Sequence, residues 1–362
     1  MKIEVKMGPK RQIIKFFLLL SLIITAPCMI YAAPDIPSPA AQQHSYVKKI
    51  IYVLEDSRFL YQIGEMDLNG DNKKMLTREG SNWAPSVSSN GEKIAYFSDR
   101  SGFTNLWEMD ADGTNQQQLT LNKENLDSID LQNRGQIEWS KDSAVIYFLK
   151  ENDIWQIDRN GETPSALTEY HDVTSFKLSP DKTKVLFSRE KTKKHNGLWT
   201  MNLDETSPRQ ITQSIIAIPA FDWGDNISLA YFHNRGITTT EYIGVNRKFI
   251  KETYYLDNDI EWSRANPADK MQNYIAYISD KNQGPNIWIM KPDGSSEEQI
   301  TTNGGFSPYW FPDGSSLVFV EGSDIYSINL RTKSKTRLTF NFSAYSPIVA
   351  EIAPAYQGSN DK

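Results

Sequence analysis

A dipeptide of Leu or Ile followed by Thr recurs along this chain at nearly constant intervals, ending at Thr77, Thr120, Thr168, Thr212, Thr301 and Thr339. Five copies have an aromatic residue twelve positions before the Leu or Ile: Trp107, Trp155, Trp199, Trp288 and Tyr326. The same offset from Tyr242 leads to Tyr254, inside the one long gap. Counting Tyr254, the steps are 43, 48, 44, 43, 46 and 38 residues. A period of about 40–45 residues made of short strands is typical of a β-propeller blade.

The unit that ends at Thr120 shows what one repeat contains. Its segments 84–88, 94–97, 106–109 and 117–120 are short and rich in β-forming residues, and turns such as Asp112-Gly113 separate them. The second segments of other units, such as 185–187 and 317–320, are apolar on both faces. Such runs favour a sheet that is sandwiched between neighbouring sheets.

The first unit lacks its first strand, because it starts at residues 50–53, which match a second strand. The missing segment is found at the other end of the chain, where residues 345–349 resemble 84–87. We therefore expect an all-β, seven-bladed β-propeller whose C-terminal strand completes the first blade, which removes free sheet edges. The fifth unit, 221–255, is the most degenerate, so a six-bladed ring with an irregular insert is the alternative.

Residues 1–32 have the features of a secretory signal peptide: a basic start, an apolar run from Phe16 to Ile24 and small residues near Ala32. The alternative is a segment retained as a membrane anchor. Residues 33–45 read as a proline-containing linker, 46–350 as the propeller and 351–362 as a loose tail. This organisation predicts a periplasmic or secreted protein.

Charge and cysteine content narrow the partners and the compartment. The formal net charge is −6, and without residues 1–32 it becomes about −10, which argues against nucleic acid as a partner. Membrane contact is expected only through the signal segment, if that segment is retained. The single cysteine, Cys28, lies within the signal segment, so stability has to come from the core.

The repeat resembles the TolB-type, WD40-like β-propeller family, whose pattern includes W-S-P-D-G, S-D-R-x-G, M-D-x-D-G and Q-x-L-T. Matching segments are 176–181, 310–314, 98–102 and 106–113. The resemblance implies a propeller. Among its members are periplasmic scaffolds that bind envelope lipoproteins, non-catalytic domains of prolyl peptidases, and uronate lyases. TolB itself has an α/β domain before a six-bladed propeller, and residues 33–46 leave no room for that domain, so the chain is not identified as TolB.

First strands line the channel of a propeller, and in this chain they carry charged residues at matching places. The candidates for partner binding are Glu138, Lys177, Asp222, Glu261 and Tyr309. Three carboxylates and one ammonium near one axis could hold a cation or the polar end of a peptide. The alternative is a hydrated tunnel with partial ion pairing.

Three histidines fall in the longer loops of neighbouring blades: His171, His195 and His233. Neutral imidazoles suit zinc-type or manganese-type ions, so these residues form a hypothetical metal site. The alternative is scattered surface histidines. The expectation is therefore no required cofactor, with a divalent cation as the open alternative.

The chain contains no G-x-S-x-G elbow, H-E-x-x-H motif or glycine-rich phosphate loop, so no catalytic motif identifies an enzyme. One face of the propeller carries the loops between second and third strands and the connections between blades, and we call it the long-loop face. We expect a non-catalytic scaffold that engages a protein or peptide of the cell envelope through this long-loop face or through the central channel. The alternative is a uronate-lyase-like, carbohydrate-active enzyme or a sugar-binding propeller. Phe103, Tyr170 and Phe306 are the loop aromatics that would favour sugar.

Overall fold

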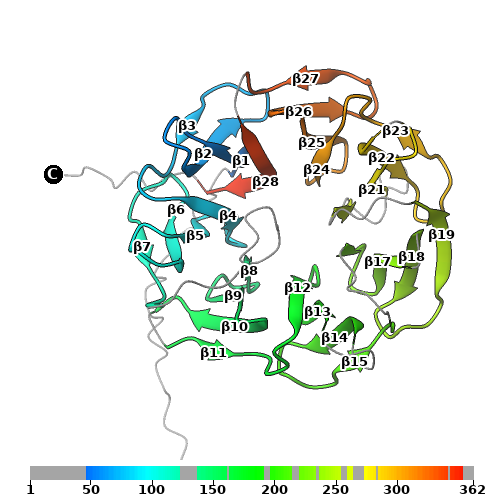
Figure 1. Cartoon of the computed structure of the whole chain (residues 1–362), viewed down its shortest axis with the longest axis horizontal. Helices are drawn as coiled ribbons and strands as arrows, with labels where there is room; N and C mark the ends of the chain where they lie inside the picture. The colour runs from blue at the N-terminus through cyan, green and yellow to red at the C-terminus, as the bar shows by residue number, and fades with distance from the viewer. Residues whose placement is uncertain are drawn as a thin grey trace, which may run out of the picture. The chain divides into compact units, whose positions relative to one another are not determined.

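The computed structural model describes residues 46–122, 137–160, 163–190, 196–213, 220–233, 236–253, 259–263, 273–282, 284–340 and 343–353. These residues form seven four-stranded antiparallel sheets that follow one another around a central opening (Figure 1). The prediction of an all-β, seven-bladed propeller is confirmed, and the six-bladed alternative is set aside. Within the described ranges, no helix has the length and apolar character needed to cross a membrane.

The blades are numbered from the N-terminus, and each is given from its innermost to its outermost strand. Blade 1 consists of β28 (Ala344–Ile352), β1 (Val47–Glu55), β2 (Tyr61–Asp67) and β3 (Lys74–Met75). Blade 2 consists of β4 (Asn82–Val87), β5 (Lys93–Ser98), β6 (Asn105–Asp110) and β7 (Gln117–Gln118). Blade 3 consists of β8 (Ile137–Trp139), β9 (Val145–Lys150), β10 (Asp153–Asp158) and β11 (Ser165–Ala166). Blade 4 consists of β12 (Val173–Leu178), β13 (Lys184–Arg189), β14 (Gly197–Asn202) and β15 (Arg209–Gln210).

The remaining blades keep the same order. Blade 5 consists of β16 (Phe221–Trp223), β17 (Ser228–His233), β18 (Gly236–Glu241) and β19 (Lys248–Glu252). Blade 6 consists of β20 (Ile260–Trp262), β21 (Ile275–Ser279), β22 (Asn286–Met290) and β23 (Glu298–Gln299). Blade 7 consists of β24 (Phe306–Trp310), β25 (Ser316–Glu321), β26 (Asp324–Asn329) and β27 (Lys335–Arg337).

The ring closes where the last strand joins the first. Strand β28 pairs with β1 from Val47↔Ile352 to Leu54↔Ala344, as the sequence predicts. The C-terminal segment also reaches blade 2, because the backbone N–H of Ala353 donates to the carbonyl of Gly91 at 2.9 Å. A Cβ on Gly91 would lie 2.3 Å from the carbonyl oxygen of Glu351, so only glycine fits this turn.

The hydrophobic core lies between the blades. Within the described residues there are seven clusters of buried side chains, and each draws its members from two neighbouring blades. In one of them, Trp83 and Phe97 of blade 2 pack with Trp139 and Phe148 of blade 3. The indole N–H of Trp139 also donates to the carbonyl of Ser86 at 2.9 Å. Trp223 and Trp310 make the same bond to the carbonyls of Lys177 and Glu261, so inner-strand tryptophans join blades 3, 5 and 7 to the blade before, in line with the predicted interblade packing.

The recurring threonine has a structural cause. Its hydroxyl accepts the backbone N–H of a residue near the start of the third strand. The same hydroxyl donates to the side chain of the residue directly before that one. In blade 2, Thr120 accepts from the N–H of Leu106 at 2.9 Å and donates to Oδ1 of Asn105 at 3.0 Å. Equivalent pairs of bonds are made by Thr77, Thr168, Thr301 and Thr339. The Leu or Ile before each Thr is available for the core, which explains the dipeptide.

The Asn or Asp in this arrangement also fixes the chain that leaves the blade. Oδ1 of Asn105 accepts the N–H of Asn122 at 2.7 Å, and Oδ1 of Asp153 accepts the N–H of Tyr170 at 2.8 Å. One buried hydroxyl and one short polar side chain thus hold the outer strand and the connection to the next blade.

A polar cluster joins blades 5 and 6. Glu297 accepts hydrogen bonds from Tyr277 at 2.5 Å, Lys251 at 2.9 Å and Lys281 at 2.8 Å. Burial by itself raises the pKa of Glu297, but the bonds from Lys281, Tyr277 and Lys251 outweigh it and lower the pKa from 4.5 to about 2. Because Lys251 belongs to blade 5, the carboxylate ties the two blades together.

Replacing Thr120 with Val should lower the free energy of unfolding by about 2 kcal/mol, since it leaves the buried Leu106 N–H and Asn105 amide oxygen without this partner. Urea denaturation measures the change. Thr104→Val in the same blade is the control and should stay within about 0.5 kcal/mol of the wild type. Equal losses for the two variants would contradict the assignment.

Glu297 should make the free energy of unfolding depend on pH in the acid range. Its folded pKa is depressed, so its stabilisation is complete above about pH 4.5 and is lost as the pH falls towards 2. We expect the free energies of unfolding of the wild type and Glu297→Gln to differ most near pH 6 and to converge near pH 2. Denaturation at a series of pH values tests this, and a constant difference would rule it out.

Candidate binding site in the central channel

The five residues predicted to bind a partner occupy one equivalent position on the innermost strands. Register with the second strands puts Ile348, Ser86, Glu138, Lys177, Asp222, Glu261 and Tyr309 at this position in blades 1 to 7. The fold therefore brings these positions into one ring, and the binding of a partner there stays a prediction.

A cavity of about 470 Å³ lies among these strands. Inner strands of six blades line it, and four of the five predicted residues take part: Glu138, Lys177, Glu261 and Tyr309. The lining continues to Ser88, Ser89 and Pro312 in the turns between first and second strands. The cavity therefore extends towards the face of the propeller that carries the tight turns.

One wall of the cavity is mainly apolar. It comes from blades 7, 1 and 2 and includes Tyr309, Phe311, Ile348, Val349 and Pro85. Each of these inner strands is bulged at a small residue that precedes a proline. These residues have positive φ: Ala84 (51°), Ser307 (56°) and Ser346 (46°). Bulges redirect side chains at functional edges, so the three Pro-containing strands give this wall its shape.

The opposite wall is charged and comes from blades 3, 4 and 6. Nζ of Lys177 lies 3.0 Å from Oε1 of Glu261 and 3.3 Å from Oδ1 of Asp222. Nζ of Lys182 lies 2.7 Å from Oε2 of Glu138. Among the described residues, the first group joins the Lys177 ammonium to the carboxylates of Glu261 and Asp222, so this wall is built from ion-paired side chains.

Asp222 has a different role from its neighbours. It is fully buried, and its Oδ2 accepts the backbone N–H of Trp262 at 2.8 Å. Its other oxygen faces Lys177. Asp222 is not part of the cavity lining, so it positions Lys177 from behind the cavity wall.

Lys182 and Glu351 line the cavity and were not identified from the sequence. Lys182 has φ 58° in the turn after β12, where the corresponding residues of blades 2 and 7 are Gly91 and Gly314. A lysine at a position that favours glycine was the available signal. Glu351 belongs to the segment that was expected to be a tail, but β28 continues to Ile352.

The three histidines of the metal hypothesis are placed differently. Nδ1 of His171 lies 2.8 Å from Oδ2 of Asp153, and Nε2 of His233 lies 3.2 Å from the carbonyl oxygen of Gln213. Burial lowers the pKa of His233. His195 lies outside the described residues. Within the part of the chain that is described, no three His, Cys, Asp or Glu side chains gather as a metal site.

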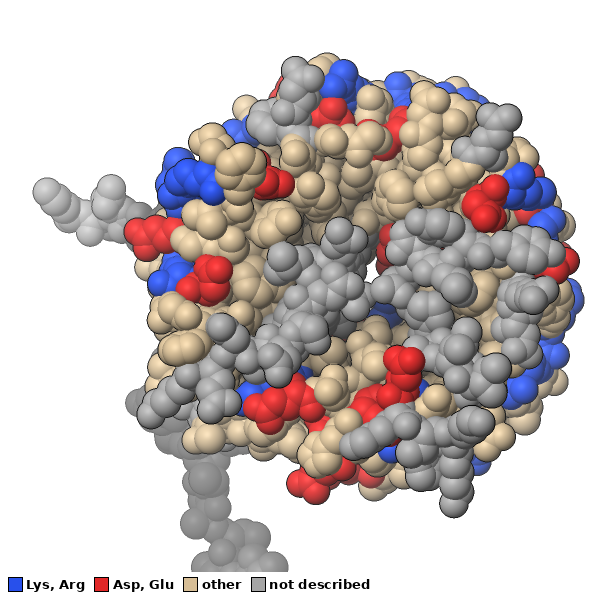
Figure 2. Space-filling model, viewed as in Figure 1, with Lys and Arg blue, Asp and Glu red and all other residues tan. Residues whose placement is uncertain are grey.

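The surface charges are mixed. On the face seen in Figure 2, the described Lys and Arg side chains alternate with Asp and Glu around the rim. Together with the net charge of −6, this pattern favours local recognition over attraction to a uniformly charged partner.

No protein-family model matches the chain, and a search of curated proteins finds no relative. Among solved structures, an oligogalacturonate lyase in complex with manganese matches with a TM-score of 0.57 and 13% identity, over 81% of this chain and 85% of its own. TolB from Acinetobacter baumannii matches with a TM-score of 0.52 and 17% identity, over 83% of this chain and 66% of its own. An oligogalacturonate lyase from Vibrio parahaemolyticus matches with a TM-score of 0.52 and 12% identity, over 80% of this chain and 84% of its own.

These comparisons show that the chain shares the propeller fold of TolB and of the oligogalacturonate lyases. At such low identities the likeness concerns the fold alone. The fold and the cavity together define a seven-bladed β-propeller with an amphipathic pocket in its channel.

Lys177→Met should lower the free energy of unfolding by about 3 kcal/mol, because it removes the ammonium that lies 3.3 Å from the fully buried carboxylate of Asp222. The double variant Lys177→Met/Asp222→Asn should recover part of the loss. Lys333→Met is the matched control, since Lys333 pairs with Glu298 on the surface and should change stability by less than about 1 kcal/mol. Chemical denaturation compares the three, and equal effects of the two single variants would contradict the role of Lys177.

Proposed function

We propose that this protein is a non-catalytic binding scaffold of the periplasm or the extracellular space that holds a peptide segment of a cell-envelope protein in its central channel. The observation that carries this proposal is the cavity with one apolar and one charged wall. The location rests on the signal-like residues 1–32 and on the fold shared with TolB.

The dimensions of the cavity suit a ligand of a few residues. Its volume of about 470 Å³ falls within the range of about 300–1,000 Å³ that is usual for ligand pockets. Inner strands paired within rigid sheets form its walls, so the site is largely formed before the ligand arrives. Little conformational entropy would then be lost on binding.

The two walls favour an extended peptide. Side chains of an extended chain point alternately to opposite sides. One set would contact Tyr309, Phe311 and Ile348, and the other would face Glu261 and the Lys182–Glu138 pair. The carboxylates of Glu138, Glu261 and Glu351 line the cavity and favour a basic side chain or an amino terminus of the peptide.

A uronate-lyase-like or sugar-binding activity is the second candidate, and the fold shared with the manganese-bound lyase favours it. Such an enzyme would need the metal ligands that His171, His195 and His233 were expected to supply. His171 and His233 each use one ring nitrogen, towards Asp153 and the Gln213 carbonyl, and within the described residues they do not gather with further ligands.

Capture of a partner tests the proposal. Tagged protein without residues 1–32 is incubated with cell-envelope extract, beside a glycan array and an assay for cleavage of oligogalacturonate with Mn²⁺. We expect a protein partner whose retention falls at least about tenfold in Tyr309→Ala and Glu261→Gln, because each change alters one wall of the cavity.

Phe249→Ala is the control, since Phe249 is 55% exposed on the outer strand of blade 5. Its retention of the partner should match that of the wild type. Glycan binding or sugar cleavage without a protein partner would contradict the proposed scaffold function and support the sugar-related activity.

A further inference from the structure

The loop between the second and third strands of blade 1 contains a phenylalanine where blade 2 has a glycine. In blade 2 the N–H of Gly102 donates to the carbonyl of Asp99 at 2.8 Å, and in blade 1 the N–H of Phe59 donates to that of Asp56 at 2.9 Å. Both residues have positive φ, 95° for Gly102 and 63° for Phe59. Glycine adopts this conformation without steric cost, whereas phenylalanine does not.

The strain at Phe59 has no compensation in the core. Its side chain is 81% exposed, so the ring contributes little to the packing of blade 1. Among the described non-glycine residues with positive φ, Phe59 is the only Phe, Tyr, Trp, Leu, Ile or Val. A strained backbone that displays a large apolar ring to solvent points to recognition, because neither the turn nor the core requires that ring.

The loop that carries Phe59 is held rigidly. Oδ1 of Asp56 accepts the N–H groups of Arg58 at 2.8 Å and Leu60 at 3.2 Å. Oδ2 of Asp56 accepts Nε of Arg58 at 3.0 Å and Nη2 at 2.6 Å. Bonding to Arg58 holds the pKa of Asp56 below its usual value.

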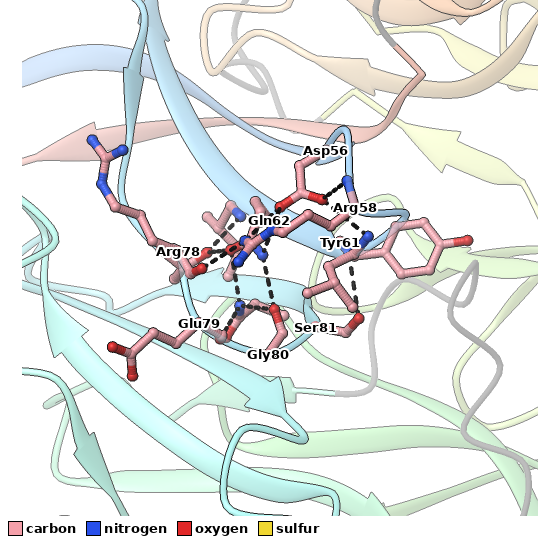
Figure 3. Close-up of polar contacts among 12 residues, drawn as sticks. Asp56, Arg58, Tyr61, Gln62, Arg78, Glu79, Gly80 and Ser81 are labelled. Atoms are coloured by element: carbon pink, nitrogen blue, oxygen red, sulfur yellow. Dashed lines mark hydrogen bonds and ion pairs between the residues drawn. The ribbon is translucent and has the colours of Figure 1, made fainter.

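Further bonds attach this loop to the connection between blades 1 and 2 (Figure 3). Nη2 of Arg58 donates to the carbonyl of Arg78 at 2.8 Å, and Nε2 of Gln62 donates to that of Gly80 at 2.8 Å. The N–H of Tyr61 donates to Oγ of Ser81 at 3.4 Å. The loop that contains Phe59 and the connection between blades 1 and 2 are therefore held together by hydrogen bonds.

The connection between blades 1 and 2 that is bonded to this loop also carries charged side chains. Arg78 and Glu79 are exposed, and in Figure 3 their side chains point away from the hydrogen-bonded network. Within the described residues, the guanidinium of Arg78 makes no ion pair. Arginine and aromatic residues dominate the energetics of protein interfaces, and arginine also forms bidentate pairs with carboxylates.

Other apolar side chains are exposed on this face. Phe103 is 37% exposed in the corresponding loop of blade 2, and Leu121 is 83% exposed just after Thr120. Nδ2 of Asn122 donates to the carbonyl of Thr104 at 2.9 Å. This bond joins the residues that directly follow Leu121 and Phe103. We call Phe59, Arg78, Phe103 and Leu121 the knob surface.

The knob surface is separate from the channel. Its members lie in loops that follow second and fourth strands, whereas the cavity extends to the turns between first and second strands. These two kinds of connection lie on opposite faces of a propeller. None of the four residues lines the cavity.

We propose that the knob surface docks a folded protein, with the ring of Phe59 inserted into an apolar pocket of that protein and Arg78 paired with a carboxylate at the rim of the pocket. A protruding, pre-ordered ring fits a concave partner and loses little entropy on binding. The exposed guanidinium supplies the charge complementarity that fixes the orientation.

Photo-crosslinking in cells that make the full chain identifies the partner. Position 59 carries photoreactive benzoylphenylalanine in one sample, and position 249, an exposed phenylalanine on the outer strand of blade 5, carries it in the control. We expect one protein adduct from position 59 that is absent at position 249. The adduct is identified by mass spectrometry, and that protein is purified for binding measurements.

Binding and melting of Phe59→Gly then separate recognition from structure. Because glycine relieves the positive-φ strain, this variant should melt at the wild-type temperature or above it, yet bind the purified partner at least about tenfold more weakly. Arg78→Glu should weaken binding with unchanged melting, and Phe249→Ala should bind like the wild type.

Four results would overturn the proposal. They are a lower melting temperature for Phe59→Gly, no adduct above the position-249 control, an adduct with a second copy of this chain, and unchanged affinity of Phe59→Gly for the purified partner. Loss of channel binding in Tyr309→Ala leaves this docking intact, so the two proposals fail independently.

Discussion

Packing between neighbouring blades is the interaction on which the structure depends. Each of the seven buried clusters takes residues from two adjacent blades, so no blade has a core of its own. A terminal blade would therefore expose one apolar face and one free edge unless the ring closed. Strand β28 prevents this, because it pairs with β1 and supplies Ala344 and Val349 to the cluster between blades 7 and 1.

The backbone geometry repeats from blade to blade, whereas the residues at the ends of the strands differ. The threonine hydroxyl ties the third and fourth strands in five blades. Blades 4 and 5 depart from this pattern, because Gly197 and Gly236 stand where those five blades have Gln, Asn or Asp. Both proposed surfaces also arise at departures from the repeat. Lys182 and Phe59 each occupy a positive-φ position where another blade has glycine, and each adds a side chain that the fold does not require.

The channel shows how a repeated position becomes a specific site. Equivalent residues of the inner strands are apolar in blade 1 and charged in blades 3 to 6, so similar backbones build two unlike walls. Bulges at Ala84, Ser307 and Ser346 each precede a proline and lie in the three inner strands of the apolar wall. Strand β12 of the charged wall is also bulged, between Val173 and Ser175, but it contains no proline. The asymmetry belongs to the side chains, because the sheets themselves repeat.

The sequence by itself determined the period, the strand content and the closure by the C-terminal strand. These features follow from local patterns: alternation of short apolar runs, turn residues and a dipeptide at fixed spacing. Only the tertiary structure decided that Asp222 is buried behind Lys177, that Lys182 reaches Glu138 and that Phe59 stands exposed. Those outcomes depend on side-chain direction and on contacts between blades far apart in the chain, which no spacing along the sequence encodes.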